Sequence, residues 1–193
     1  MGIILNTTEN NCHIAIWDMQ ESLNEIIKLS KPFDLIRLKT EQRKKEFLTS
    51  RLLLEQLSPN AIITYNQFGA PKLDNGKHIS IAHSKKMVAI ITSQQQVSVD
   101  IEKISMKALR VSSKFVSEKN LKKLSKEKAT LIWCIKEAAY KWHQKGGVDF
   151  IKDIVIPEFS AKERGETTIH FKNKELNLNY QKINNHYLVY ICK

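Results

Sequence analysis

The sequence has few cysteines and no long hydrophobic run. Its three cysteines, Cys12, Cys134 and Cys192, lie far apart in 193 residues and form no C-x-x-C pair. Their odd number and wide spacing favour reduced, structural thiols in a cytosolic protein. No apolar stretch reaches the roughly 20 residues that a membrane-spanning helix needs, and no basic leader precedes an apolar region. We therefore expect a cytoplasmic protein with neither a signal peptide nor a membrane partner.

Repeats, low-complexity segments and one common catalytic motif are also missing. There is no repeat at a solenoid period, no low-complexity segment and no G-x-S-x-G motif of a serine esterase. Basic residues are abundant, because 31 Lys and Arg stand against 20 Asp and Glu, which gives a net charge of +11. This excess favours an anionic partner, which leaves nucleic acid, an anionic membrane, phosphate ligands and an acidic protein open.

The hydrophobic pattern mixes helices with strands that follow one another closely. Helices are predicted over residues 40–57, with Thr40 as the N-cap, and over about residues 130–145, ended by two glycines. A three-stranded meander is predicted over residues 167–171, 176–180 and 187–192. Strands in hairpins rather than β-α-β units indicate an α+β fold with antiparallel sheets. The aperiodic segment 103–113 suggests a division into residues 1–102 and 103–193.

Residues 97–102 alternate between apolar and polar side chains. A strand with this pattern places Asp100 and Glu102 on one face, opposite Val97, Val99 and Ile101. Two neighbouring carboxylates repel each other, so either this face is solvated or a cation compensates its charge. Oxygen ligands on a rigid strand suit magnesium.

A second group of polar residues lies on the helix predicted near the C-terminal end. Trp133, Glu137 and Lys141 are four residues apart, on a face next to the apolar stripe. A surface ion pair between Glu137 and Lys141 is the plain interpretation, worth roughly 0.3–0.5 kcal/mol. Their aromatic and apolar neighbours instead indicate partial burial and a functional role.

These two segments together resemble the phosphopantetheinyl transferases. That family has G-[IV]-D-[IVL]-E on a strand and, about thirty residues later, W-x-x-K-E-[AS]-x-x-K on a helix, which match residues 99–102 and 133–141. Residues 79–84 resemble the family's I-S-H-S strand, and residues 115–117 its F-[FL]-S helix start. Residues 41–57, with Arg43 and Arg51, resemble the first long helix of the surfactin-type enzymes.

The resemblance implies both a fold and an activity. The fold is two similar halves, each an antiparallel sheet packed with helices, which form a pseudo-dimer in one chain and act as a monomer. The activity is that of a holo-[acyl-carrier-protein] synthase type enzyme with Mg²⁺ as cofactor. It moves 4′-phosphopantetheine from coenzyme A to a serine of an acidic apo carrier protein and releases adenosine 3′,5′-bisphosphate.

The resemblance also implies roles for the motif residues. Asp100, Glu102 and Glu137 match the metal ligands, and Glu137 is also the candidate general base for the serine hydroxyl. Lys141 matches the lysine that meets the phosphate or the departing oxygen. These assignments predict Glu137 and Lys141 as the catalytic pair.

Coenzyme A contacts are expected from a further set of residues. His83 matches a histidine at the phosphates, and Arg51 matches the arginine that pairs with the 3′-phosphate. We add Lys45 and Lys72, although Lys72 points the other way if its segment is a strand. The sequence departs from the family at Ala82, where a serine is usual, and at Ala70, where a lysine or arginine is frequent.

Two other classes of protein remain as alternatives. A nucleic-acid-binding module would use the basic clusters at residues 43–45 and at Lys119, Lys122, Lys123 and Lys126. However, the sequence has no zinc-finger spacing, helix-turn-helix signature or aromatic RNA-binding strand, so we expect no nucleic acid partner. A metal-dependent phosphatase could use the same acidic face, and it would consume coenzyme A without a carrier protein.

Overall fold

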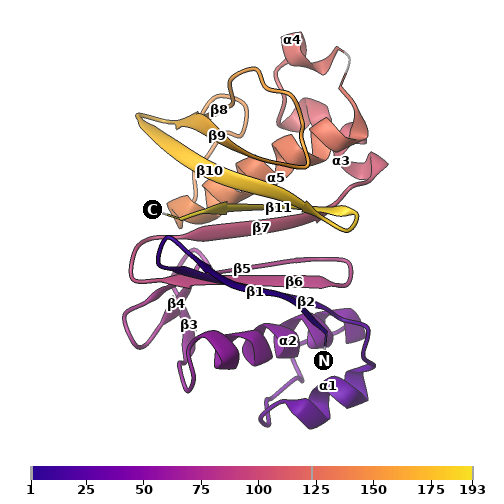
Figure 1. Ribbon diagram of the computed structural model, residues 1–193, viewed down its shortest axis with the longest axis vertical. Helices are drawn as coiled ribbons and strands as arrows, with labels where there is room; N and C mark the ends of the chain where they lie inside the picture. The colour runs from indigo at the N-terminus through magenta and orange to yellow at the C-terminus, as the bar shows by residue number, and fades with distance from the viewer. Residues whose placement is uncertain (1, 123, 193) are drawn as a thin grey trace.

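The computed structural model describes residues 2–122 and 124–192, without the side chain of Lys119, so Lys123 lies outside the description. Strands and helices are mixed, and every strand pair is antiparallel, which confirms the α+β class (Figure 1). The helices are α1 (Leu23–Leu29), α2 (Glu41–Leu57), α3 (Met106–Arg110), α4 (Glu118–Leu121) and α5 (Lys126–His143), with a 3₁₀ turn, η1, at Ser112–Lys114.

The strands form two main sheets and a small ribbon. The four-stranded sheet has the order β1 (Ile3–Glu9), β2 (Cys12–Asp18), β6 (Met87–Ser93) and β5 (His78–Ser84). The five-stranded sheet has the order β7 (Ser98–Lys103), β11 (His186–Ile191), β10 (Lys174–Ile183), β9 (Arg164–Phe171) and β8 (Ile154–Val155). The ribbon pairs β3 (Ile63–Tyr65) with β4 (Pro71–Leu73).

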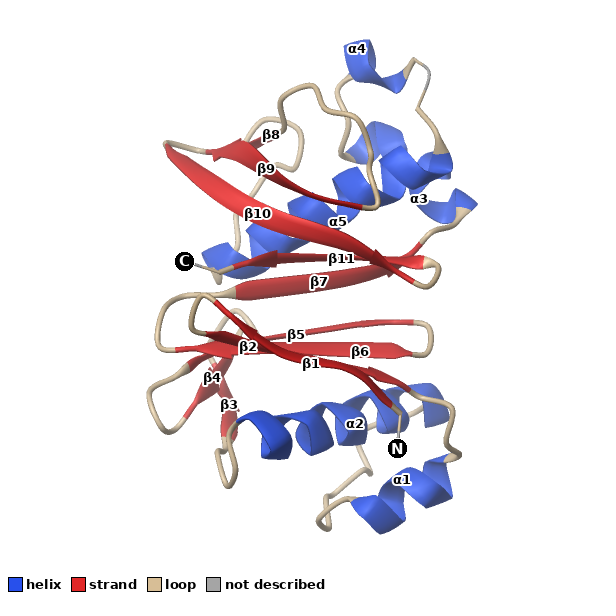
Figure 2. Cartoon of the chain, viewed as in Figure 1, coloured by secondary structure: helices blue, strands red, loops and turns tan. Residues whose placement is uncertain are grey.

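The two sheets lie between two long helices (Figure 2). One face of the four-stranded sheet packs on α2 through a core that includes Trp17, Leu53 and Ile90. One face of the five-stranded sheet packs on α5, and the remaining faces of the two sheets share a third core. The central strands are therefore covered on both faces, which explains why every residue of β6 is buried, including Thr92 and Ser93 at its end.

Three predicted elements agree with the structure. Helix α2 begins after Thr40, whose hydroxyl accepts a hydrogen bond from the Arg43 amide as an N-cap. Helix α5 begins four residues earlier than the apolar pattern indicated, after the N-cap Ser125, and its C-cap is Gln144 in the left-handed region. The C-terminal meander is confirmed as β9, β10 and β11.

Strand β7 connects the two sheets. Its backbone pairs with β11, so it is an edge strand of the five-stranded sheet, and it also lies beside β5, the edge of the other sheet. The acidic strand thus stands where the two sheets meet. The division of the chain after residue 102 and the similarity of its two halves stay predictions. In the described part of the chain, no helix has the length and apolar character needed to cross a bilayer.

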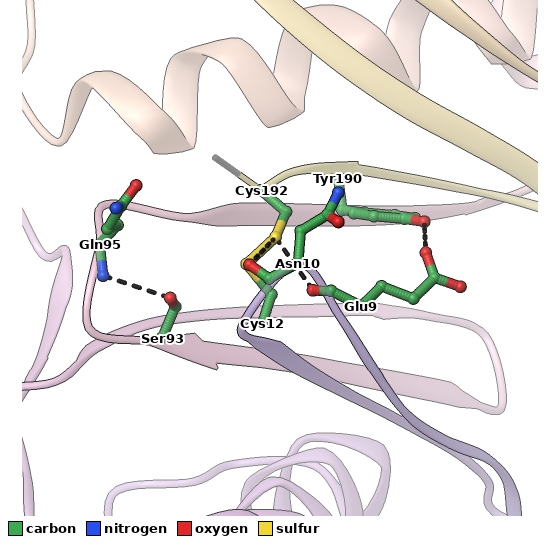
Figure 3. Close-up of a disulfide and its surroundings, with 7 residues drawn as sticks. All are labelled: Glu9, Asn10, Cys12, Ser93, Gln95, Tyr190 and Cys192. Atoms are coloured by element: carbon green, nitrogen blue, oxygen red, sulfur yellow. Dashed lines mark hydrogen bonds between the residues drawn. A yellow bond between two sulfur atoms is a disulfide. The ribbon is translucent and has the colours of Figure 1, made fainter.

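The expectation of three reduced cysteines is wrong for two of them. Cys12 and Cys192 form a disulfide across a sequence separation of 180 residues, while Cys134 is free and buried (Figure 3). The turn between β1 and β2 lies over the end of β11, where Tyr190 Oη donates a hydrogen bond to Glu9 Oε2 at 2.6 Å. Sequence spacing could not indicate this pairing, because only tertiary packing brings the two ends together.

Candidate functional site

Strand β7 carries both predicted carboxylates toward helix α5. Asp100 is only 5% exposed, and Glu102 is half-buried. Val99 and Ile101 point the opposite way, into the core between the two sheets. The predicted alternation is therefore confirmed. The solvated alternative is wrong for Asp100, because α5 covers this face of the strand.

The ammonium group of Lys141, on α5, lies against Asp100. Its Nζ is 2.7 Å from Asp100 Oδ1 and donates a second hydrogen bond to the carbonyl of Val99 at 3.3 Å. Burial disfavours the charged lysine, but the charge of Asp100 and its hydrogen bond outweigh this and raise the pKa of Lys141. The ion pair of Lys141 thus reaches across to β7 rather than along α5 to Glu137.

The second oxygen of Asp100 is buried and receives no hydrogen bond from a nitrogen or oxygen donor. The buried thiol of Cys134, whose pKa is raised by burial and by Asp100, is a nearby weak donor. Such an atom is costly, because it has lost its water without a strong protein donor in exchange. Asp100 also acts on the two other carboxylates of the site. Burial first, and then the negative charge of Asp100, raise the pKa of Glu102 and that of Glu137. The three carboxylates therefore repel one another across a shared space.

The carboxylate of Glu102 is held by two neutral donors. Ser84 Oγ, at the end of β5, donates to Glu102 Oε2 at 3.1 Å. Trp133 Nε1, on α5, donates to Glu102 Oε1 at 3.1 Å. These donors come from the four-stranded sheet and from the helix on the five-stranded sheet. The orientation of Glu102 thus depends on how the two layers meet.

Glu137 lies one turn before Lys141 on α5, half-buried. Burial and the charge of Asp100 raise its pKa to about 7, although the nearby Lys141 acts in the opposite direction. A carboxylate with a pKa near the working pH can accept a proton and release it again, which suits a general base.

The carboxylates of this site suit a magnesium ion that is shared with a substrate. Among the described residues, no three His, Cys, Asp or Glu side chains already stand together as a complete metal site. The donors are nevertheless all oxygens, and one of them, Asp100 Oδ2, is buried with no nitrogen or oxygen donor. Magnesium usually takes one or two carboxylates together with substrate phosphates and waters. Asp100 and Glu102 would hold it, with Glu137 nearby.

A hollow of about 270 Å³ lies on the other side of β5, against α2. Arg51 is fixed there by hydrogen bonds to Ser50 Oγ at 2.8 Å and Tyr65 Oη at 2.9 Å. Its guanidinium stacks 3.7 Å from the centre of the Phe47 ring. An arginine held in this way loses little further freedom when it binds a phosphate.

His83 lines the same hollow and contacts Arg43 and Glu46 of α2. Arg43 Nη1 donates to His83 Nε2 at 2.9 Å, and His83 Nδ1 is 3.4 Å from Glu46 Oε2. Burial lowers the pKa of His83, and the charges of Arg43 and Lys141 lower it further, against the opposing charge of Glu46. The hollow is therefore lined by two guanidinium groups, a neutral imidazole and the carboxylate of Glu46. Glu46 pairs with Arg43 at 3.1 Å, which leaves Arg51 as the guanidinium with no carboxylate partner in the described structure.

The structure does not bring every predicted contact to this hollow. Lys45 acts electrostatically on Glu25 of α1, and Lys72 lines a separate hollow beside His143. Ala82 is 2% exposed in the core between the sheets, so a side chain at this position points away from the hollow that Arg51 and His83 line. Ala70 lines a smaller hollow, described next.

The smaller hollow, of about 180 Å³, connects the two parts of the site. Its lining includes Lys141 and Tyr140 of α5, and it shares Gly69, Pro71 and Ile81 with the larger hollow. Gly69 has φ of +80°, a left-handed conformation that favours glycine in this turn. An elongated, multiply phosphorylated molecule could thus extend from Arg51, past the turn, to Lys141.

The sequence interpretation assigned no role in the site to four residues, although Trp133 and Arg43 belong to the motifs that it quoted. Ser84 and Trp133 hold Glu102, while Arg43 and Glu46 hold His83. Helical spacing was an available signal for Arg43, because it stands two turns before Arg51 on α2. The partner of Ser84 could not be read from sequence, since it depends on the contact between β5 and β7.

The fold and the site define an α+β protein with a carboxylate cluster where its two sheets meet and arginine-lined and lysine-lined hollows beside it. The model of the 4′-phosphopantetheinyl transferase superfamily matches residues 96–192, and the chain belongs to this superfamily. The chain is also 29% identical over 140 residues to the 4′-phosphopantetheinyl transferase gsp of Aneurinibacillus migulanus. That match covers 67% of this chain and 57% of the relative.

Proposed function

We propose that this protein is a magnesium-dependent transferase that moves 4′-phosphopantetheine from coenzyme A to a serine of an apo carrier protein. Membership of the superfamily supports phosphopantetheinyl transfer in general. The observation that supports the site most directly is Asp100, which has one oxygen on the Lys141 ammonium and the other buried with no nitrogen or oxygen donor. This is a carboxylate with a position left for a cation.

In the proposed reaction, the serine oxygen forms a bond to the phosphorus on the pantetheine side of the pyrophosphate. The bond from that phosphorus to the bridging oxygen breaks, and adenosine 3′,5′-bisphosphate leaves. Glu137 accepts the serine proton, and Lys141 places a positive charge where the phosphate oxygens gain negative charge. Bound magnesium would add charge neutralisation at the pyrophosphate.

Binding of the nucleotide part is assigned to the hollow on α2. Arg51 holds the 3′-phosphate, for which a fixed guanidinium with two donors is suited. Arg43 and His83 line the side of the hollow nearer to β5 and contribute to phosphate binding. The shared turn at Gly69 and Pro71 then leads the pyrophosphate toward Lys141.

An acidic carrier protein is the proposed second substrate. Helix α3 and turn η1 follow β7 directly and expose Met106 and Val111 among Lys107, Arg110 and Lys114. The charge of Lys107 acts on Glu102, so this surface lies close to the carboxylates. A basic surface with apolar side chains suits an acidic helix that carries an apolar contact.

Further details also stay proposals. The surfactin-type subclass, the two similar halves and the monomeric state rest on the motif resemblance and on the long helix that covers each sheet. A cytoplasmic location rests on the substrates alone, because the disulfide removes the argument from reduced cysteines.

The test is to incubate the protein with coenzyme A, magnesium and a small panel of apo carrier proteins from fatty acid, polyketide and nonribosomal-peptide systems. Mass spectrometry should show one phosphopantetheinyl group on at least one carrier. A carrier whose acceptor serine is replaced by alanine is the control and should stay unmodified. Breakdown of coenzyme A in the absence of any carrier would favour the phosphatase alternative.

A further inference from the structure

The edges of the two sheets meet along β5 and β7 through side chains. The backbone of β5 pairs with β6, and the backbone of β7 pairs with β11. Between the two edges, Ser80 Oγ accepts a hydrogen bond from the Val99 amide at 3.1 Å. Ser84 Oγ accepts one from the Lys103 amide at 3.0 Å. Two serines four residues apart thus satisfy two amides four residues apart on the facing strand.

The two serines are alike in burial but differ in their second contact. Ser80 is 5% exposed, and Ser84 is 9% exposed. Ser84 Oγ donates a hydrogen bond to Glu102 Oε2 at 3.1 Å, whereas Ser80 Oγ contacts the backbone of β7. Ser84 therefore accepts a hydrogen bond from the backbone of β7, as Ser80 does, and in addition donates one to the carboxylate of Glu102.

We propose that Ser84 is a positioning residue that sets the orientation of Glu102 for metal binding. Together with Trp133 on the other oxygen, it fixes the plane of a carboxylate that the nearby Asp100 repels. Partners of this kind, behind a metal ligand, typically change metal affinity by about 10–100-fold when they are removed. This inference rests on the metal role proposed for Glu102.

Because Ser80 and Ser84 share one kind of contact and differ in the other, the inference can be tested by metal binding, without a measurement of enzyme activity. Binding of Mn²⁺, a spectroscopic substitute for Mg²⁺, would be measured by electron paramagnetic resonance for the wild type, Ser84→Ala and Ser80→Ala. We expect Ser84→Ala to weaken Mn²⁺ binding about 10–100-fold. Ser80→Ala should leave the affinity within about twofold, because its hydroxyl touches no carboxylate in the described structure. Ser84→Thr keeps the hydroxyl and should restore most of the affinity.

The possible results separate this inference from the proposed function. Equal Mn²⁺ affinity in wild type and Ser84→Ala, or an equal loss in both alanine variants, overturns the positioning role while transfer by the wild type still supports the function. A wild type that neither binds Mn²⁺ nor modifies a carrier overturns both. If Ser84→Ala does not fold, Ser84→Cys replaces it, because the thiol has a similar size but is a weak donor. The same loss of affinity is then expected.

Discussion

The two oxygens of Asp100 have different surroundings. The Lys141 ammonium lies against one oxygen of this buried carboxylate, while the other oxygen faces no nitrogen or oxygen donor. A buried ion pair of this kind contributes little net stability but makes the loss of either partner expensive.

Replacement of Lys141 by methionine should therefore destabilise the metal-free protein. Asp100 would stay buried without its partner, so we expect the free energy of unfolding to fall by about 3 kcal/mol. Lys145→Met, at an exposed position just after the C-cap of α5, should change it little. Urea unfolding of both variants measures this, with and without magnesium, which should restore part of the loss. Equal stability of the two variants would contradict the pairing.

The raised pKa of Glu137 gives a prediction for pH. As a general base it must be ionised, so kcat/KM for the carrier should rise with pH until about 7 and then level off. Glu137→Gln should lower transfer by roughly 10²–10⁴-fold and remove this inflection. Stability has the opposite dependence. Because the pKa in the folded state lies above the ordinary 4.5, the stabilising contribution is present below pH 4.5 and is lost as the pH rises to about 7.

Magnesium can separate the two roles of Glu137. Rates of transfer by the wild type and by Glu137→Gln would be recorded across pH 5–9 at several magnesium concentrations. Only the pH range in which Glu137→Gln stays folded would be used. If Glu137 is mainly a ligand, excess magnesium should restore the rate of Glu137→Gln. Full restoration would rule out the base role.

Among the elements, α2 supplies both arginines that line the hollow of about 270 Å³ beside β5. Arg43, Phe47 and Arg51 are each separated by four residues, so one face of the helix carries both guanidinium groups and the ring between them. The N-cap Thr40 fixes the start of the helix, and a buried stripe including Leu53 and Leu54 fixes its rotation against the sheet.

Arg51→Met should weaken coenzyme A binding with little effect on turnover. Loss of a hydrogen-bonded charge at a non-reacting phosphate is expected to raise KM about 10–100-fold and to spare kcat. Lys44→Met is the control, because Lys44 is on the same helix but does not line the hollow. With 3′-dephospho-coenzyme A the difference between wild type and Arg51→Met should disappear. A difference that persists would place the 3′-phosphate elsewhere.

Local pattern predicted the elements of the site better than their assembly. Alternation placed Asp100 and Glu102 on one face, and helical spacing placed Glu137 one turn from Lys141. The ion pair from Lys141 to Asp100 could not be predicted, because it depends on how α5 crosses β7. The direction of Lys45 could not be predicted without the rotation of α2. For Lys72, strand alternation already indicated that it points the other way, and β4 is a strand with Lys72 at a separate hollow.

At the scale of the whole molecule, the disulfide connects the two sheets. Cys12 begins β2 in the four-stranded sheet, and Cys192 follows β11 in the other. Both cysteines belong to or pack against the core between the sheets. Sequence spacing suggested separate thiols, since the closure of a loop of 180 residues leaves no local signal.

Removal of this disulfide should lower thermal stability. Chain entropy gives an upper estimate of about 5 kcal/mol for a loop of this length. We expect Cys12→Ser combined with Cys192→Ser to melt at a lower temperature than the wild type and to lose its response to a reductant. Thiol titration of the denatured wild type should find one free thiol, that of Cys134. Three free thiols, with no effect of reductant on melting, would contradict the disulfide.

The most direct test of the central claim compares the two products of the proposed reaction. Wild-type protein would be incubated with coenzyme A, magnesium and an apo carrier protein, and adenosine 3′,5′-bisphosphate and modified carrier would be quantified together. The proposed function predicts equal amounts of the two products, no bisphosphate without the carrier, and neither product with Asp100→Asn. Bisphosphate released without a modified serine, or unchanged products with Asp100→Asn, would contradict the account.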